Sequence, residues 1–174
     1  MYHTGETVMY AGTGVCKITD IVKQNFTNTE ERTYYVLKAV YDSSGTTIYC
    51  PVDNAEIKIR DLLSRKQIEE MLCGNCCDDE NPKQPLWTDN ASARKRLFTQ
   101  IVKDGNQPEI FQLITEIHEK QQEMQQNGKK LHISDEKIMH EAEKIISQEL
   151  AYTMNINIDE VADFVTQKMQ AAAD

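Results

Sequence analysis

Hydrophobic and polar residues alternate along the first sixty residues, and this alternation predicts β-strands. The extended runs cover residues 6–10, 15–23, 33–41 and 46–50, with a short fifth run at 57–59. β-Branched and aromatic residues are frequent in these runs, as is typical of strands. Glycine-containing turn signals at residues 11–14 and 42–45 separate them. Because no helix interrupts the strands, we expect an antiparallel sheet that closes into a small barrel.

A helical period replaces the alternation after residue 63. Ser64 is a suitable N-cap for a helix that carries Ile68 and Leu72 on one face. The polar, acidic stretch 74–85 predicts a linker. Four more helices are expected, at about 90–103, at about 108–126, from an N-cap at Ser134, and from about Asp159.

Each of these four helices has an apolar stripe at three- and four-residue spacing, which indicates mutual packing in a bundle. The stripes are Leu97, Phe98, Ile101 and Val102; Ile110, Phe111, Leu113, Ile114 and Ile117; Ile138, Ala142, Ile145, Ile146, Leu150 and Ala151; and Val161, Ala162, Phe164, Val165 and Met169. The sequence therefore predicts an α+β protein. We expect the small barrel over residues 1–62, a connecting helix and linker over 63–88, and a helical domain over 89–174.

The charge distribution limits the partners of the chain. The formal net charge is −9, and residues 105–174 contain 6 Lys/Arg against 13 Asp/Glu. Non-specific nucleic-acid binders are usually basic, so any DNA contact must come from a local cationic patch. We find no apolar run long enough for a membrane span and no secretory signal, and we expect a cytoplasmic protein with reduced cysteines.

The cysteine group 73–77 (Cys-Gly-Asn-Cys-Cys) contains one CxxC spacing. A structural zinc site usually draws on two such pairs, and no second pair or spaced histidines accompany this one. We interpret the group as a helix end and linker, with zinc binding and a redox role as alternatives. Catalytic motifs such as a P-loop, Gly-x-Ser-x-Gly or His-Glu-x-x-His do not occur, so we expect neither an enzyme nor a cofactor.

Two neighbouring features raise the question of function. Trp87 is the only tryptophan and precedes a helix in a polar stretch. It is either a hydrophobic staple on the bundle or an exposed aromatic wedge. Arg94, Lys95 and Arg96 stand near the start of the next helix, where cations oppose the helix dipole. They are either a solvated face or an anion-binding patch, and an aromatic beside such a patch suits a minor-groove or fork-junction binder.

These features resemble the CarD/CdnL family of bacterial regulators that bind RNA polymerase. The resemblance begins at Gly5-Glu6-Thr7-Val8-Met9-Tyr10 and continues through Tyr34-Tyr35-Val36-Leu37-Lys38 and Ile48-Tyr49-Cys50-Pro51-Val52-Asp53. In the second half it rests on the tryptophan before a basic helix and on Ser134-Asp135-Glu136-Lys137, before a helix that ends in Glu149-Leu150-Ala151. It covers nearly the whole chain, and residues after about 153 match least.

The resemblance implies a mechanism. The barrel would be of the Tudor-like (SH3-like) type and would dock on the polymerase β subunit, with Lys23, Phe26 and Tyr49 on strands at the polymerase-facing edge. The helical domain would contact promoter DNA at the upstream edge of the bubble and stabilise the open complex, with Trp87 as the wedge. Arg94, Lys95 and Arg96 would bind phosphates. We expect a monomer without a small-molecule substrate; the alternative is a polymerase-bound adaptor that makes no direct DNA contact.

Overall fold

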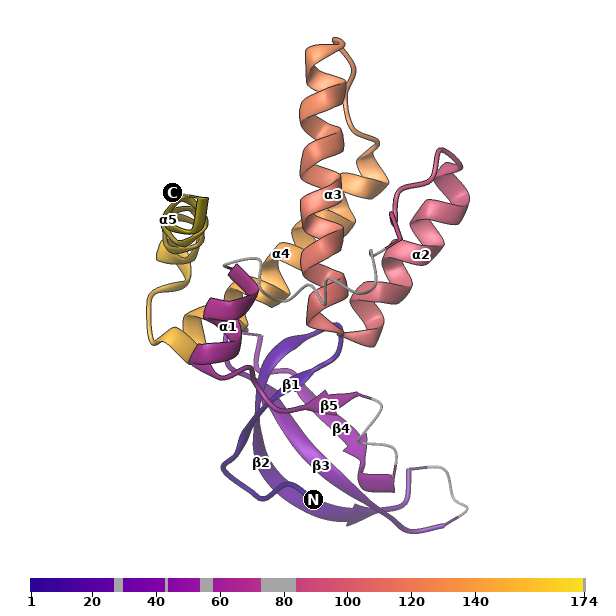
Figure 1. The fold of residues 1–174 in the computed structure, drawn as a ribbon. Coiled ribbons are helices and arrows are strands. Elements are labelled where there is room, and N and C mark those ends of the chain that lie inside the picture. Colours follow the sequence, from indigo (N-terminus) through magenta and orange to yellow (C-terminus); the bar gives the residue numbers. More distant parts are fainter. Residues whose placement is uncertain (27–29, 43, 54–57, 73–83, 174) are drawn as a thin grey trace. The chain divides into compact units, whose positions relative to one another are not determined.

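The structure is a computed structural model that describes residues 1–26, 30–42, 44–53, 58–72 and 84–173. The chain divides into two compact units, Met1–Leu62 and Leu63–Asp174. The first contains β1 (Thr7–Tyr10), β2 (Gly14–Gln24), β3 (Arg32–Ala39), β4 (Thr47–Pro51) and β5 (Ile59–Arg60). The second contains α1 (Arg65–Leu72), α2 (Ala91–Asp104), α3 (Gln107–Gln126), α4 (Ile133–Met154), η2 (Ile158–Glu160) and α5 (Val161–Ala173) (Figure 1). The predicted α+β layout is confirmed.

The first unit is one antiparallel sheet with strand order β4-β3-β2-β1-β5. The expected closure into a barrel is wrong, because among the described strands β5 pairs with β1 and β4 with β3, so the sheet is open. Alternation predicts a strand but not its partners, and within the described residues β5 pairs with Met9 and Tyr10 of β1 and with no residue of β4. β2 is bent instead, by a register shift between Ile18 and Asp20.

The core of the first unit lies on one face of this sheet. Its buried residues are Val8, Cys16, Ile18, Tyr35, Leu37, Cys50 and Ile59. The N-terminus is tied to this core, since the backbone N–H of Tyr2 donates to the Tyr35 hydroxyl at 3.0 Å. Burial raises the pKa of the Cys16 thiol to about 11, and burial also raises the pKa of Cys50. Both thiols are therefore neutral core groups.

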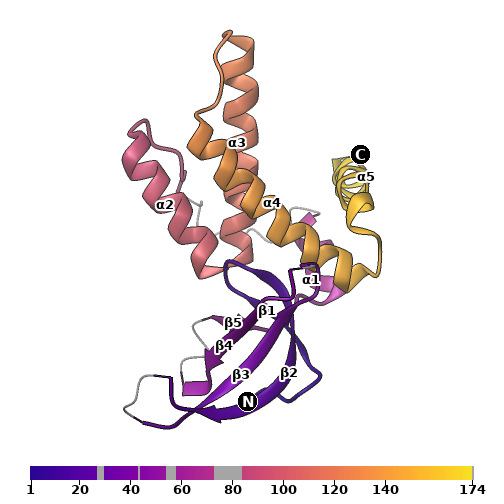
Figure 2. The same ribbon diagram turned by 180° about the vertical axis from the view of Figure 1, so that it is seen from behind.

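The second unit is a helical bundle in which α2 and α4 both pack against α3 (Figures 1 and 2). Most of the predicted stripe residues are buried: Phe98, Ile101, Val102, Ile110, Leu113, Ile117, Ile138, Ala142, Ile145, Ile146, Leu150, Ala151 and Val161. Leu97 departs from the prediction, because 41% of its surface is exposed. Phe111, Ile114 and Val165 are half-buried, so α3 and α5 leave part of their apolar stripes uncovered.

Capping interactions explain where helices α2 and α4 begin and where α2 ends. Asn90 caps α2, since its side-chain oxygen accepts from the backbone N–H groups of Ser92 and Ala93 at 3.1 Å. Gly105 ends α2 in the left-handed conformation at φ 72°. The prediction that Ser134 caps α4 is wrong. The cap lies two residues earlier, at His132, whose ring nitrogen accepts the Ser134 N–H at 3.2 Å.

Helix α1 is held on α4 by polar contacts that the sequence pattern did not reveal. Glu149 is 1% exposed and accepts the Leu63 N–H at 2.8 Å. The Arg65 guanidinium donates to the carbonyls of Thr153 and Met154 at the end of α4. Such contacts satisfy carbonyls that a helix end would leave without partners. No helix in the described part of the chain is long and apolar enough to cross a membrane.

Candidate nucleic-acid interface

The segment before α2 is fixed by one carboxylate of α3. The backbone N–H groups of Leu86 and Trp87 both donate to Oε2 of Glu116, at 2.8 and 3.0 Å. The other oxygen of Glu116 accepts from the Gln112 side chain at 2.8 Å. Hydrogen bonds to a charged acceptor are stronger than neutral ones, so Glu116 sets the backbone position from which the Trp87 side chain projects.

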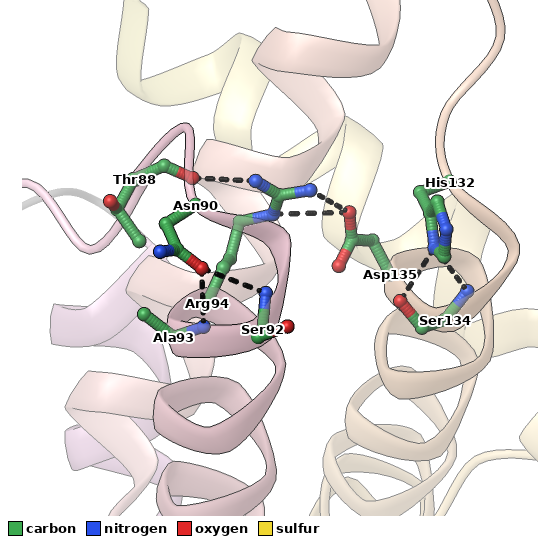
Figure 3. Close-up of polar contacts among 8 residues, drawn as sticks. All are labelled: Thr88, Asn90, Ser92, Ala93, Arg94, His132, Ser134 and Asp135. Carbon is green, nitrogen blue, oxygen red and sulfur yellow. Dashed lines mark hydrogen bonds and ion pairs between the residues drawn. The ribbon is translucent and has the colours of Figure 1, made fainter.

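Arg94 is the second support of this segment. Its Nη2 and Nε donate to Oδ2 of Asp135 at 2.7 and 3.1 Å, and its Nη1 donates to the Thr88 carbonyl at 2.5 Å (Figure 3). The Arg94 side chain is 7% exposed and that of Asp135 is fully buried. One guanidinium therefore joins α2, the N-terminus of α4 and the backbone beside Trp87.

The Trp87 ring lies against this guanidinium. The Cζ atom of Arg94 is 4.2 Å from the ring centroid, a cation–π distance. The ring of Phe98 lies on the core side, with its centroid 6.3 Å away and its plane tilted by 54°. Trp87 is half-buried, so the ring is partly packed on the bundle and partly in solvent. Part of the ring thus packs on the bundle, as a staple would, and the rest is exposed to solvent.

The burial of Arg94 changes the expectation for the cationic patch. A guanidinium shared between Asp135 and Thr88 does not reach a DNA phosphate in this conformation, because its donors point into the unit. Lys95 and Arg96 are both exposed on α2. The three consecutive cations are separated by the 100° rotation per residue of an α-helix, which turns the first inward and leaves the next two outside.

Two surface hollows meet at Trp87 and differ in charge. The acidic hollow, of about 390 Å³, is lined by Pro85, Trp87, Glu116, Glu119, Lys120 and Glu123. The basic hollow, of about 380 Å³, is lined by Trp87, Arg94, Met124, Lys130, Leu131, His132, Ile133 and Asp135. In the basic hollow the buried Asp135 balances Arg94, which leaves Lys130 as the exposed cation. A polyanion would therefore meet Trp87 from the Lys130 side.

Lys120 belongs to the acidic hollow and is committed to a local pair. Its Nζ lies 2.6 Å from Oε2 of Glu123 and 6.0 Å from the Trp87 centroid. The hydrogen bond to Glu123 raises the pKa of Lys120, and the charges of Glu123 and Asp89 act in the same direction. This lysine offsets one glutamate of the hollow and leaves Glu116 and Glu119 to make it negative.

The residues expected to face the polymerase lie in the first unit. Phe26 and Tyr49 are 54% and 45% exposed, and their ring centroids are 5.1 Å apart in an edge-to-face arrangement. Phe26 also meets Tyr34 at 5.1 Å, so three aromatic rings form one exposed cluster. Phe26 was expected on a strand, but it lies two residues beyond the end of β2.

Lys23 does not share the face of this aromatic cluster. β2 pairs Val22 with Tyr34 and Lys23 with Thr33, and β3 pairs Val36 with Tyr49. Because side chains alternate between the faces of a sheet, Lys23 projects on the face opposite Tyr34 and Tyr49. Lys23 is exposed, and any contact it makes belongs to the edge of the sheet or to the other face.

Reasoning from the sequence missed the partners that hold the site. Glu116 and Asp135 lie on two other helices, 29 and 41 residues from the groups they bind. A buried acidic residue in the first turn of a helix gives no signal of its partner in a single sequence. Tyr34 was recognised as a strand residue, but its pairing with Phe26 depends on the turn that follows β2.

The cysteine group 73–77 lies outside the described residues. Within the ranges that the structure describes, no group of three or more His, Cys, Asp or Glu side chains is placed to hold a metal ion.

A comparison with protein-family models identifies the type of domain that forms the first unit. Residues 2–63 match the family model of the CarD-like/TRCF RID domain, and a search of curated proteins found no match. The chain is therefore a transcription-related protein whose N-terminal domain interacts with RNA polymerase. That domain belongs to the CarD-like family, which confirms the resemblance over this part of the chain. The helical unit lies outside the matched residues, and its likeness to the family remains a prediction.

Proposed function

We propose that this chain is a non-enzymatic, cytoplasmic regulator that binds the β subunit of bacterial RNA polymerase and contacts promoter DNA at the upstream edge of the transcription bubble. The helical unit would stabilise the open complex through Trp87. The observation that carries the proposal is the half-exposed indole between Arg94 and Phe98, fixed before any ligand arrives. An aromatic side chain held in this way suits an unstacked base step.

Pre-organisation of Trp87 lowers the entropic cost of DNA binding by the proposed wedge. A loose side chain loses about 0.5–1.5 kcal/mol when it is immobilised on binding. Arg94 and Glu116 have already restricted the Trp87 segment, so this cost falls on folding and not on DNA binding. A wedge that meets only unstacked DNA favours the open complex by its differential affinity, about 1–3 kcal/mol for a typical coupling between sites.

The cationic contacts follow from the local charges. We assign phosphate contacts to Lys95 and Arg96, which are exposed, and to Lys130 in the basic hollow. Arg94 takes a positioning role, because its donors are used by Asp135 and Thr88. The acidic hollow on the other side of Trp87 would repel a phosphate backbone, which restricts the orientation of bound DNA.

The alternative is an adaptor on the polymerase that makes no direct DNA contact. It is supported by the same acidic hollow, which Glu116, Glu119 and Glu123 line together with Trp87. In that arrangement Trp87 would anchor a protein partner, as buried aromatic residues do at many interfaces.

The test is the lifetime of the open complex on a promoter fragment with bacterial RNA polymerase. Wild-type protein is expected to lengthen the lifetime, while Trp87→Ala binds polymerase equally well and does not. Lys95→Ala/Arg96→Ala is expected to weaken binding to forked DNA and lower its salt dependence. Lys103→Ala, an exposed cation at the other end of α2, is the matched control. An unchanged lifetime with intact polymerase binding would assign the chain to the adaptor alternative.

A further inference from the structure

A groove of about 480 Å³ runs between α3, α4 and α5 in the helical unit. It shares Glu119 with the acidic hollow and is otherwise separate from the residues around Trp87. On α3 the wall extends from Phe111 to Gln122, which is three helical turns or about 16 Å. The groove is therefore long enough to receive several consecutive side chains from one ligand.

One end of the groove is apolar because the predicted stripes of α3 and α5 are not fully covered. Phe111, Ile114 and Val165 all line it, and all three are half-buried. Leu150 of α4 forms the floor at the same end and is 1% exposed. Apolar surface left in water is unfavourable relative to burial, so this end favours an apolar ligand.

The other end of the groove is acidic. Glu143 of α4 and Glu119 of α3 stand there with His118, whose Nε2 is 2.9 Å from Oε1 of Glu143. His140 reaches the second oxygen of Glu143 at 3.2 Å. The groove thus changes along its length from apolar to negatively charged, which defines the chemistry of a ligand that fits it.

We propose that this groove binds an amphipathic helix of a partner protein. The apolar stripe of that helix packs on Phe111, Ile114 and Val165, and a Lys or Arg further along it lies beside Glu119 and Glu143. Helices that bind in grooves present anchors at i, i+3, i+4 and i+7. These anchors span about two turns, which leaves the third turn of the wall for the basic residue. The inference does not depend on the proposed DNA contact.

The charge of the chain argues against a second copy as the occupant. Residues 105–174 carry 13 acidic and 6 basic residues, so two such units would meet with like charges at the acidic end of the groove. Like-charge juxtaposition opposes association and favours a basic partner. DNA is disfavoured at this end for the same reason.

The experiment measures binding of a defined peptide to the full chain by fluorescence anisotropy. The probe is a labelled, alanine-based peptide of about four helical turns, with leucines at i, i+3, i+4 and i+7 followed by two arginines. A second peptide has two glutamates in place of the arginines. We expect the arginine peptide to bind about tenfold more tightly, with a preference that declines as salt rises. Glu143→Gln, which keeps the size of the side chain, is expected to reduce that preference.

A blocking variant identifies the groove as the binding site. Ala162 lines the groove on α5 and is exposed, and arginine is nearly as good a helix former as alanine, so Ala162→Arg should fold and abolish binding. Gln167→Arg places the same new charge on an exposed position of α5 outside the groove and should bind normally.

Several results would overturn the proposal. They are no binding of either peptide at millimolar concentration, equal binding of both, or binding that survives Ala162→Arg. A concentration-dependent dimer of the chain alone that disappears in Ala162→Arg would assign the groove to a second copy. Saturation by dodecyltrimethylammonium without peptide binding would assign it to a small cationic amphiphile.

Discussion

Arg94 stacks on Trp87, with the guanidinium carbon 4.2 Å from the centroid of the indole ring. The same guanidinium forms a buried ion pair with Asp135, so the cation cannot swing away without leaving a buried carboxylate unpaired (Figure 3). Removing one partner of such a pair usually costs about 3–5 kcal/mol. The position of the indole is therefore coupled to the stability of the helical unit.

Replacing Arg94 by lysine tests this coupling. Lysine keeps the charge but has neither the planar group that lies over the indole nor the two donors that share Oδ2 of Asp135. Arg94→Lys is expected to lower the free energy of unfolding by about 1–2 kcal/mol. Because Trp87 is the only tryptophan, its fluorescence should also become easier to quench with acrylamide. Arg96→Lys is the control on an exposed neighbour; equal quenching in both variants would mean that Arg94 does not hold the ring.

Glu116 is expected to order the backbone before α2. Glu116→Ala removes the acceptor shared by the Leu86 and Trp87 N–H groups, and each hydrogen bond to a charged group contributes about 1.5–3 kcal/mol. Amide hydrogen exchange at these two positions should accelerate by at least about tenfold, while Glu119→Ala leaves both rates unchanged. Unaltered exchange in Glu116→Ala would show that the segment is held by the Trp87 ring alone.

The aromatic cluster of the first unit should carry a large share of polymerase binding. Phe26→Ala and Tyr49→Ala each remove an exposed ring that is already ordered by its neighbour, and we expect each to weaken binding to the isolated β subunit by about tenfold or more. Tyr152→Ala, at a tyrosine of similar exposure on α4, is the matched control. Lys23→Ala is expected to have a smaller effect that depends on salt. Equal affinities for all four variants would exclude the cluster from the interface.

The raised pKa values of the two buried thiols predict that they are alkylated slowly in the folded chain. Burial raises the pKa of Cys16 to about 11 and also raises the pKa of Cys50, so at pH 8 the thiolate needed for alkylation is scarce. Iodoacetamide should modify Cys16 roughly a hundredfold more slowly in the native chain than in urea, and Cys50 should also react more slowly, as followed by site-resolved mass spectrometry.

The raised pKa of Cys16 also determines the direction in which the free energy of unfolding changes with pH. The unfolded thiol ionises near pH 8.5 and the folded one near 11, so the Cys16 contribution to stability is full below pH 8.5 and is lost as the pH rises toward 11. Urea unfolding at pH 7.5 and pH 10 should show this decline, and Cys16→Val should reduce it. An equal decline in the variant would mean that other groups cause it.

The sequence predicted the secondary structure well because local patterns decide it. Alternation gave the strands, and three- and four-residue spacing gave the helices. Ser64, which was expected to cap a helix, accepts the Gln67 N–H at the start of α1. Closure of the sheet was not predictable in this way. It depends on which strands pair at the two ends of the sheet, which local alternation does not specify.

The candidate site also combines features that are local in the sequence with contacts that depend on the tertiary structure. The sequence by itself determined that one tryptophan stands before a helix with three consecutive cations near its start, because both features are local. Tertiary structure alone decided that Arg94 is a buried support for Trp87 while Lys95 and Arg96 remain in solvent. The reason is that Asp135 and Glu116 reach the segment from other helices, and contacts between residues distant in the chain depend on how the helices pack.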